Sequence, residues 1–276
     1  MNVGIYINTK KHNFIEPFKT FYNALSERGA NLCVASSTDY KFEFTETVSV
    51  DTLCKISDIV ITLGGDGTVL QAVPFIVKYD KAIMGINFGH LGFLTEFNKD
   101  SDYATIADMI VNKKFFSEER TVLGINYNGE TVYALNEAVL GRGDSSKLVA
   151  VDVNIGDEHF DTYHADGVIV ATATGSTAYS LASGGPIMAP DVDALIVNGI
   201  CPHSLHHRAL VISGNEGIKL SNKSAKAYLT ADGNTIAVLD KNSTVTIKKA
   251  ERTIRFLRFN TASFYDRINS KLNRRG

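Results

Sequence analysis

The stretch Asp58-Ile-Val-Ile-Thr-Leu-Gly-Gly-Asp-Gly-Thr68 decides the fold. Its first half is apolar and β-branched, which is typical of a strand buried on both faces of a parallel sheet. Three of the next four residues are glycines, and an apolar helical pattern follows from Val69 to Val77. Glycines allow a sharp turn and close approach of a ligand, and a helix N-terminus favours an anion. We therefore expect phosphate to bind at Gly64, Gly65, Gly67 and Thr68.

Asp66 places a carboxylate inside this glycine loop, residues 64–68. A carboxylate repels phosphate, so we expect it to take a proton or to hold a metal. The alternative is an ordinary strand-to-helix turn in which Asp66 is the helix N-cap. N-caps rarely need three flanking glycines, which favours the functional interpretation.

The composition is that of an ordinary globular protein. The 276 residues are 44% hydrophobic and 21% charged, enough for one large or two ordinary domains. A net charge of −2 argues against a nucleic-acid partner. The basic residues near the C-terminus are predicted to form a solvated face: Arg252, Arg255, Arg258, Arg267, Lys271, Arg274 and Arg275.

The cysteines and the apolar runs predict a cytoplasmic, soluble protein with no membrane partner. Cys33, Cys54 and Cys201 are far apart and lack CxxC spacing, so we expect reduced thiols and neither a disulfide nor a zinc site. A strand pattern starts at once after Met1, which leaves no room for a signal peptide, and no apolar run approaches ~20 residues.

Outward from the glycine loop, helix and strand patterns alternate through about residue 115. Strands are predicted at 2–8, 31–35 and 81–87, helices at 15–28, 51–56 and 103–112, and a loop at 39–50. This alternation predicts a doubly wound α/β domain over residues 1–118, with its ligand at the carboxyl ends of the strands.

From Arg120 onward apolar and polar residues alternate, and turn signals are closely spaced. Asn128-Gly129 is a strong hairpin signal, and 177–182 is the one helix expected before residue 250. The pattern predicts an antiparallel β-sandwich-like domain over residues 119–261. A final helix, about 262–276, is expected to pack back on the first domain.

Three further stretches stand out. Asn136 and Glu137 put an amide and a carboxylate at a strand end, although a surface strand end is the alternative. Residues 171–185 gather hydroxyls, glycines and Tyr179, which suit a polar ligand with a ring, against the alternative of a plain Ser/Thr loop. Residues 202–207 hold three histidines without the further ligands that zinc needs, so no zinc site is predicted there.

The common nucleotide and hydrolase signatures are absent. The sequence has no G-x-x-x-x-G-K-[ST] loop, no dinucleotide fingerprint after the first strand and no serine nucleophile elbow. The glycine loop therefore remains the candidate phosphate site.

Taken together, eight motifs resemble those of bacterial NAD kinases, in the same order. The first is shared with diacylglycerol-type lipid kinases and resembles the phosphofructokinase loop, but the set covers residues 1 to about 266 and is highly specific. The motifs are Gly64-Gly-Asp-Gly-Thr68, Asn87-Phe-Gly-His-Leu-Gly-Phe-Leu94, Asn136-Glu137, Ala165-Asp-Gly167, Thr174-Gly-Ser-Thr-Ala-Tyr179, Gly184-Gly-Pro186, Pro202-His-Ser-Leu205 and Asp232-Gly233.

The resemblance implies an α/β domain, a β-rich domain and an NAD site in the cleft between them. It makes Asp66 the proton acceptor with Gly67 beside it at the NAD, and puts the adenosine half of NAD at Asn136 and Glu137. It also assigns NAD contacts to these residues: His164, Asp166, Thr177, Ala178, Tyr179, Ser180, Leu181, Ala182 and Asn234.

Three positions depart from the family pattern. Ala173 stands where proline is usual, Asn234 where glutamine is usual, and Gln71 where a basic residue is frequent. These changes predict a less rigid loop at 173, a weakened NAD contact at 234 and a weaker phosphate contact at 71.

The expected activity is ATP-dependent phosphorylation of NAD at the 2′-hydroxyl of its adenosine ribose, with Mg²⁺ or another divalent cation carried by ATP. The resemblance also implies a homodimer or homotetramer, in which His164 and Asp166 can reach a neighbour's site. The rivals are another small-molecule or lipid kinase and a non-catalytic NAD(P) sensor. A lipid kinase would usually show Asn-Glu soon after its glycines, and pure binding does not need Asp66.

Overall fold

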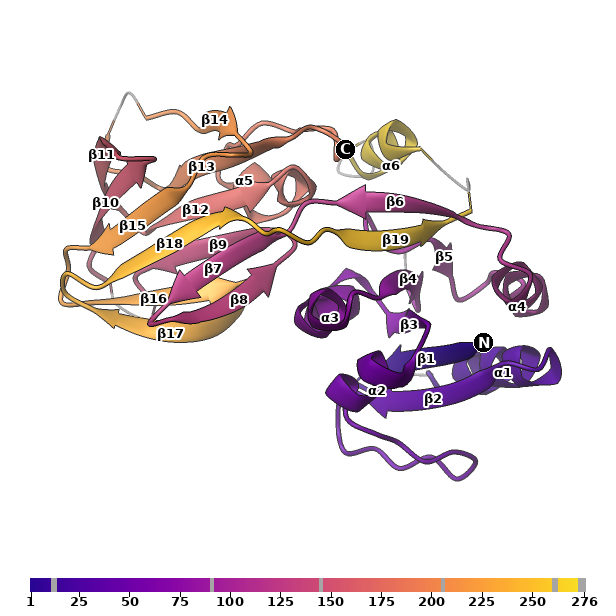
Figure 1. The fold of residues 1–276 in the computed structure, drawn as a ribbon. Coiled ribbons are helices and arrows are strands. Elements are labelled where there is room, and N and C mark those ends of the chain that lie inside the picture. The colour runs from indigo at the N-terminus through magenta and orange to yellow at the C-terminus, as the bar shows by residue number, and fades with distance from the viewer. Residues whose placement is uncertain (11–13, 90–91, 144–145, 205–206, 260–262, 273–276) are drawn as a thin grey trace. The chain divides into compact units, whose positions relative to one another are not determined.

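The computed structural model describes residues 1–10, 14–89, 92–143, 146–204, 207–259 and 263–272 (Figure 1). The chain divides into two compact units. The first unit is Met1–Glu119 with Ile254–Gly276, and the second unit is Arg120–Thr253. Six residues singled out from the sequence lie outside the described ranges, namely His90, Leu91, Leu205, His206, Arg274 and Arg275.

The first unit is a mixed sheet with helices on both faces. The strands lie in the order β2-β1-β3-β4-β19-β6, and β5 also pairs with β4. Its elements are β1 (Asn2–Ile7), α1 (Ile15–Glu27), β2 (Asn31–Ser36), α2 (Val50–Ile56), β3 (Ile59–Gly64), α3 (Asp66–Tyr79), β4 (Ala82–Asn87), β5 (Phe97–Asn98), α4 (Tyr103–Val111), β6 (Phe116–Arg120), β19 (Ile254–Arg258) and α6 (Phe264–Leu272).

β3 lies at the centre of this unit because both of its faces are apolar. Every residue of β3 is buried. Ile59, Ile61 and Leu63 pack in one cluster with α1 and α4. The alternate side chains face α2 and α3, since successive strand residues point to opposite faces. At Gly4 on this second face, a Cβ would lie 2.7 Å from Leu53 of α2. The predicted doubly wound α/β fold is confirmed.

β19 joins the first sheet from a distant part of the chain. It pairs in parallel with β4, through Arg255 with Ala82 and Phe256 with Ile83. Figure 1 shows β6 on its other side with the opposite arrow direction. Residues 254–258 therefore complete the α/β sheet, whereas the sequence placed them in the β-rich stretch.

The second unit consists of two antiparallel six-stranded sheets. The first sheet has the order β11-β10-β15-β18-β7-β8 and the second β14-β13-β12-β9-β16-β17. The strands are β7 (Leu123–Tyr127), β8 (Glu130–Ala134), β9 (Glu137–Gly141), β10 (Val149–Ile155), β11 (Glu158–Ala165), β12 (Gly167–Thr172), β13 (Ala194–Ile200), β14 (Leu210–Ser213), β15 (Ile218–Asn222), β16 (Lys226–Ala231), β17 (Asn234–Asp240) and β18 (Thr244–Lys249).

One core holds the two sheets of the second unit face to face. Val151 and Leu220 of the first sheet share a buried cluster with Leu140 and Val168 of the second. This is the predicted β-sandwich-like arrangement, which is confirmed. The hairpin predicted at Asn128-Gly129 joins β7 to β8, and both residues have positive φ, 51° and 83°.

The outer face of the second sheet is covered at its centre. Ala173 and Met188 pack on Val139, Ile169 and Ile196. The covering segment, residues 173–188, contains the short helices η1 (Thr174–Thr177) and α5 (Tyr179–Ala182), where the sequence predicted one helix at 177–182. β9 and β12 are therefore buried on both faces, and this burial fixes the position of the chain that continues from each strand.

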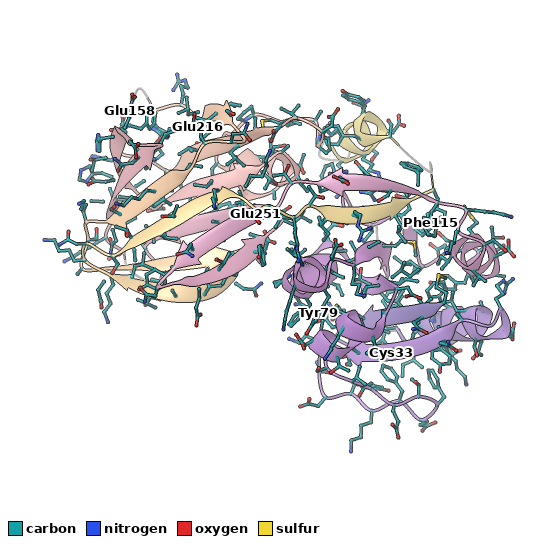
Figure 2. The ribbon with its side chains drawn as sticks, in the orientation of Figure 1. Cys33, Tyr79, Phe115, Glu158, Glu216 and Glu251 are labelled. Atoms are coloured by element: carbon teal, nitrogen blue, oxygen red, sulfur yellow. The ribbon has the colours of Figure 1, made fainter. Side chains whose placement is uncertain are left out.

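All three cysteines are free thiols. Cys33 is half-buried on β2 (Figure 2), Cys54 is buried in α2, and Cys201 is exposed. Burial raises the pKa of Cys54 to about 12. Among the described residues, no helix is both long and apolar enough to cross a membrane.

Candidate active site

The glycine loop lies where the carboxyl ends of three strands meet. The backbone N–H of Asn8, after β1, donates to the carbonyl of Leu63 in β3 at 2.9 Å. The N–H of Phe88, after β4, donates to the carbonyl of Gly64, also at 2.9 Å. In the sheet, β2 lies on one side of β1, whereas β3 and then β4 lie on its other side, so the order in which strands are added reverses between β1 and β3. Ligands of doubly wound sheets bind at such a switch point.

The glycines of the loop differ in what they contribute. A Cβ at Gly64 would lie 2.9 Å from Cβ of Asn8 and would overlap the side chain of Thr68, so packing requires glycine there. Nδ2 of Asn8 donates to Oγ1 of the buried Thr68 at 3.3 Å. At Gly67, by contrast, a Cβ would meet no described atom within 4 Å. Gly64 and Thr68 thus build the turn, and Gly67 leaves space beside the first turn of α3.

Asp66 is the first residue of α3, and Gly65 is the N-cap. The N-cap alternative for Asp66 is therefore wrong. Its carboxylate accepts two backbone hydrogen bonds from the segment after β4: from Phe93 N–H to Oδ2 at 2.8 Å and from Leu94 N–H to Oδ1 at 3.2 Å. At Gly92 a Cβ would overlap this carboxylate, so the segment can approach only with glycine there.

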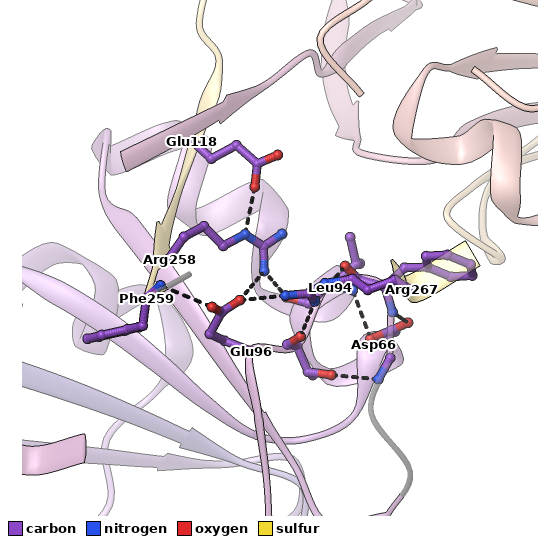
Figure 3. Close-up of polar contacts among 10 residues, drawn as sticks. Asp66, Leu94, Glu96, Glu118, Arg258, Phe259 and Arg267 are labelled. Atoms are coloured by element: carbon purple, nitrogen blue, oxygen red, sulfur yellow. Dashed lines mark hydrogen bonds and ion pairs between the residues drawn. The ribbon is translucent and has the colours of Figure 1, made fainter. Parts of the chain in front are cut away.

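Two buried arginines hold the other side of residues 92–96, which we call the Asp66-binding turn (Figure 3). Arg267 of α6 donates to the carbonyl of Thr95 at 2.6 Å and to Oε2 of Glu96 at 2.7 Å. Arg258 of β19 donates to the same Oε2 at 3.1 Å and to Glu118 at 2.6 Å. The prediction of a solvated basic face is wrong for Arg258 and Arg267, which are 5% and 7% exposed.

Glu96 is the acidic partner that the arginines share. Burial raises its pKa, but the N–H of Phe259 and the two guanidinium groups outweigh burial and leave the pKa below its ordinary value. Glu96 is 3% exposed, so it forms a buried ion triad with Arg258 and Arg267. The arginines could not be assigned from the sequence because Glu96 lies more than 160 residues away.

The second unit contains a pocket of about 500 Å³. Three predicted site residues line it: Glu137, Asp166 and Tyr179. The sequence did not assign the other lining residues, namely Val139, Gly141, Arg142, Gly143, Ile200, Tyr228, Thr230, Gly233 and Thr235. The pocket thus joins the strand end at 137, the turn at 233 and the segment at 179.

Glu137 is a buried acid with incomplete hydrogen bonding. It is 7% exposed, and its Oε2 has no hydrogen-bond partner among the described residues. Burial first, and then the charge of Asp232, raise the pKa of Glu137 to about 7, against the opposing hydrogen bond from the backbone N–H of Tyr179. A buried acid with unused acceptor capacity is suited to a ligand with hydroxyl or amino donors.

Asp232 fixes the backbone around Asn136 and Glu137. Its carboxylate accepts from the N–H groups of Leu135 and Asn136 at 2.8 Å each, and of Glu137 at 3.1 Å. Burial raises the pKa of Asp232, and these three donors oppose it. Asp232 and Gly233 both have positive φ, as in a tight hairpin turn. The Asp232-Gly233 pair was singled out as a motif, but no role was predicted for the carboxylate of Asp232.

The remaining predicted NAD contacts are unevenly placed. Asp166 forms an ion pair with Arg142 at 2.8 Å beside the pocket. His164, on β11, and Asn234, at the start of β17, are exposed and do not line the pocket. In the predicted segment, Ser180 is buried, whereas Thr177, Ala178 and Leu181 are half-buried and Ala182 is exposed.

The histidine-rich stretch at 202–207 is partly outside the described residues. Of its histidines, His207 accepts from the N–H of Gly199 through Nε2 at 3.1 Å, which occupies that nitrogen. Within the described ranges, no group of three or more His, Cys, Asp or Glu side chains could hold a metal ion.

Comparison with known proteins identifies the family. Residues 3–115 match the ATP-NAD kinase N-terminal domain, and residues 135–259 match the ATP-NAD kinase C-terminal domain. The chain belongs to the ATP-NAD kinase family. The NAD kinase of Thermoanaerobacter sp. (strain X514) is 35% identical over 284 residues, covering 99% of each chain. That of Natranaerobius thermophilus is 31% identical, covering 98% of this chain and 97% of the relative.

Solved structures agree with this assignment. Yeast NADH kinase complexed with NADH superposes with a TM-score of 0.84 at 26% identity, covering 98% of this chain and 85% of that chain. An NAD kinase from Archaeoglobus fulgidus in complex with ATP gives a TM-score of 0.79 at 23% identity, covering 99% of both chains, which supports the fold.

Two of the departures from the family pattern have local explanations. Ala173 is 1% exposed and packs in the cluster under the second sheet, so neighbouring side chains restrain it without a proline ring. Oε1 of Gln71 accepts from the hydroxyl of Tyr6 at 2.9 Å, so residue 71 is tied to β1.

Proposed function

We propose that the chain transfers the γ-phosphoryl group of ATP to the 2′-hydroxyl of the adenosine ribose of NAD, which gives NADP. Both domains of the ATP-NAD kinase family are present in one chain. The observation that carries the proposal is the position of Asp66, a carboxylate at the first turn of α3 where the strands of the first sheet end. Phosphoryl transfer depends on positioning a nucleophile and neutralising charge at such a place.

Asp66 would accept the proton of the attacking hydroxyl. A carboxylate has about four lone-pair sites, and two are used by the N–H groups of Phe93 and Leu94. The remaining sites can accept from a ribose hydroxyl. The two amides also restrict the rotation of the carboxylate, so it would meet the substrate in one orientation.

The phosphates of ATP would bind at the N-terminus of α3. Gly67 leaves open space there, and the positive end of the α3 helix dipole favours an anion. Mg²⁺ or another divalent cation would arrive with ATP, since such ions are commonly held by one or two carboxylates together with substrate phosphates. The cation would neutralise charge on the transferring phosphoryl group.

The adenosine half of NAD would occupy the pocket of the second unit. Glu137, Asp166 and Tyr179 line this pocket, and Asp232 holds the backbone of Asn136 and Glu137 in place. The unpartnered Oε2 of Glu137 would accept from a hydroxyl or amino group of the ligand. The ring of Tyr179, 44% exposed, offers a face for stacking.

Product analysis tests this proposal directly. Purified protein is incubated with NAD, ATP and Mg²⁺, and NADP is measured with an NADP-specific dehydrogenase. One NADP should form for each ATP consumed. Omission of the cation should stop the reaction, and a diacylglycerol in place of NAD should give no phosphorylated product. ATP consumption without NADP would contradict the proposal.

The rival that the sequence left open, a non-catalytic NAD(P) sensor, is disfavoured because the matching family models and curated relatives are those of NAD kinases. Asp66 joins α3 to the Asp66-binding turn through two hydrogen bonds, which is also what a structural residue would do. A sensor would bind NAD or NADP in titration calorimetry but would form no NADP with any phosphoryl donor.

The working form would be a homodimer or homotetramer. Edge strand β14 has the apolar sequence Leu-Val-Ile before Ser213, Val211 in it is 47% exposed, and apolar edges are usually covered. Light scattering should give at least a dimer. The inactive variants Asp66→Asn and Asp166→Ala should partly restore activity when mixed and allowed to exchange subunits, and a fully active monomer would contradict this.

A further inference from the structure

We propose that Arg267, on the C-terminal helix α6, is a positioning residue for Asp66. It acts through the Asp66-binding turn, residues 92–96, whose carbonyl groups face the arginines and whose amides face the carboxylate (Figure 3). The inference rests on the proposed function, because the alignment of Asp66 matters only if Asp66 meets a substrate.

A single peptide group connects the two side chains. The carbonyl of Phe93 accepts from Nη1 of Arg267 at 3.5 Å, and the N–H of the same peptide, on Leu94, donates to Asp66 at 3.2 Å. The stronger contact of Arg267 is to the carbonyl of Thr95, at 2.6 Å. The guanidinium group therefore holds the turn at two carbonyls that flank the donor to Asp66.

The two ends of the turn are held by hydrogen bonds within the turn and to the sheet, so the arginine contacts set the orientation of the peptide groups between them. The N–H of Gly92 donates to Oγ1 of Thr95 at 2.8 Å. The N–H of Glu96 donates to the carbonyl of Gly85 in β4, also at 2.8 Å. The far end of the turn is thus fixed to the sheet. The carbonyls of residues 93–95 would be poorly paired in the absence of the arginines, and buried carbonyls need partners.

Charge works in the same direction as geometry. Arg267 and Arg258 place two positive charges behind the turn, and the negative charges of the buried Glu96 and the half-buried Glu118 lie on the guanidinium groups. The positive ends face carbonyl oxygens, which polarises the peptides so that their N–H groups bind a carboxylate more strongly. Because the two arginines and Glu96 are buried, solvent screens them little.

The planar fork of arginine suits this position. Nη1 reaches the carbonyl of Thr95 while Nη2 reaches Glu96. A lysine side chain at this position would supply a point charge without two fixed donors. The variant Arg267→Lys should therefore keep the charge of the triad but lose part of the alignment.

The test compares Arg267→Met and Arg267→Lys with the control Arg255→Met. Arg255 is also in the first unit and also pairs with an acid, Asp80, at 3.2 Å, but it contacts the far end of α3. We expect kcat for NADP formation to fall about 10- to 100-fold in Arg267→Met, since small misplacements of a reacting group have effects of this size. The dissociation constant for NAD should change less than about twofold. Arg267→Lys should be intermediate, and the control should match the parent.

Hydrogen exchange supplies a readout that does not depend on turnover. The amides of Phe93 and Leu94 should exchange faster in both Arg267 variants, and not in Arg255→Met. The double variant Asp66→Asn/Arg267→Met should have the same kcat as the single variant Asp66→Asn. Unchanged exchange at these amides, or a kcat loss that only follows the unfolded fraction, would overturn the inference. If the parent forms no NADP, the proposed function fails, and the exchange result still decides whether Arg267 positions the turn.

Discussion

The two acids at the centre of the candidate sites are treated in opposite ways by their surroundings. Asp66, in the first unit, is half-buried and accepts two backbone N–H bonds from one short turn. Glu137, in the second unit, is 7% exposed, and its Oε2 has no described partner. Peptide donors fix the orientation of Asp66, whereas burial leaves Glu137 with acceptor capacity and a pKa of about 7. We propose that this contrast separates a carboxylate held for chemistry from an acid held for binding.

Removal of the charge at Asp66 should have the largest effect. In Asp66→Asn the shape is kept, but the carbonyl oxygen alone can accept from Phe93 or Leu94, and no base remains. We expect kcat to fall about 10²- to 10⁴-fold while NAD still binds. Steady-state kinetics and titration calorimetry measure the two quantities. Near-normal turnover of the variant would mean that Asp66 has only a structural role. The proposed difference in function between Asp66 and Glu137 would then be wrong.

The ion triad behind Asp66 should have the next largest effect, on stability. Glu96→Gln leaves two buried guanidinium groups without their shared carboxylate. Breaking a buried ion pair in this way destabilises by about 3–5 kcal/mol. Urea unfolding followed by fluorescence or circular dichroism measures the change. Asp80→Asn, which breaks the exposed pair with Arg255, is the matched control and should change stability far less. Equal changes in the two variants would contradict the proposed strength of the triad.

Local patterns were sufficient for most of the fold. The apolar run at 59–63, the glycine loop and the Asn128-Gly129 turn are signals that adjacent residues carry by themselves. The place of β19 could not be predicted because its partner, β4, is about 170 residues away, and a strand's own pattern does not name its neighbour. The same reason applies to Arg258 and Arg267, whose partner Glu96 is equally distant.

Site residues could be proposed from the sequence only where side chains would carry the chemistry. Asp66, Asn136 and Glu137 were singled out because a carboxylate or amide is visible in the sequence. The donors that hold Asp66 are backbone amides, which every residue except proline possesses, so no residue type could mark Phe93 or Leu94. Asp232 was singled out only as part of a motif, although its carboxylate organises the Asn136-Glu137 backbone.

The raised pKa of Glu137 predicts a pH-dependent stability that Glu137→Gln should remove. The pKa rises from an ordinary 4.5 to about 7 in the folded chain, so the folded state binds more protons between these values. The stability contributed by the neutral acid is present below pH 4.5 and is lost as pH rises through 7. Relative to the parent, the variant should gain on the order of 3 kcal/mol between pH 4.5 and 8.

Urea unfolding of the parent and Glu137→Gln at several pH values measures this difference. Glu130→Gln, an exposed position on β8, controls for the loss of one negative charge. A constant difference between parent and Glu137→Gln across the pH range would mean that Glu137 is not the proton-linked group. The contrast between the two acids would then rest on hydrogen bonding alone.

The smallest expected effect concerns Asn136, and it tests whether the second unit serves NAD rather than ATP. Asn136 is half-buried, and its N–H and carbonyl are engaged with Asp232 and Thr172, so truncation of its side chain leaves the backbone supported. Loss of one ligand hydrogen bond corresponds to about 0.5–1.5 kcal/mol. Asn136→Ala should therefore weaken NAD binding by about two- to tenfold and leave ATP binding unchanged. Asn126→Ala, exposed on β7, is the control. Titration calorimetry with each nucleotide decides the question, because equal losses for NAD and ATP would indicate a general disturbance, and no loss for NAD would return Asn136 to a surface strand end.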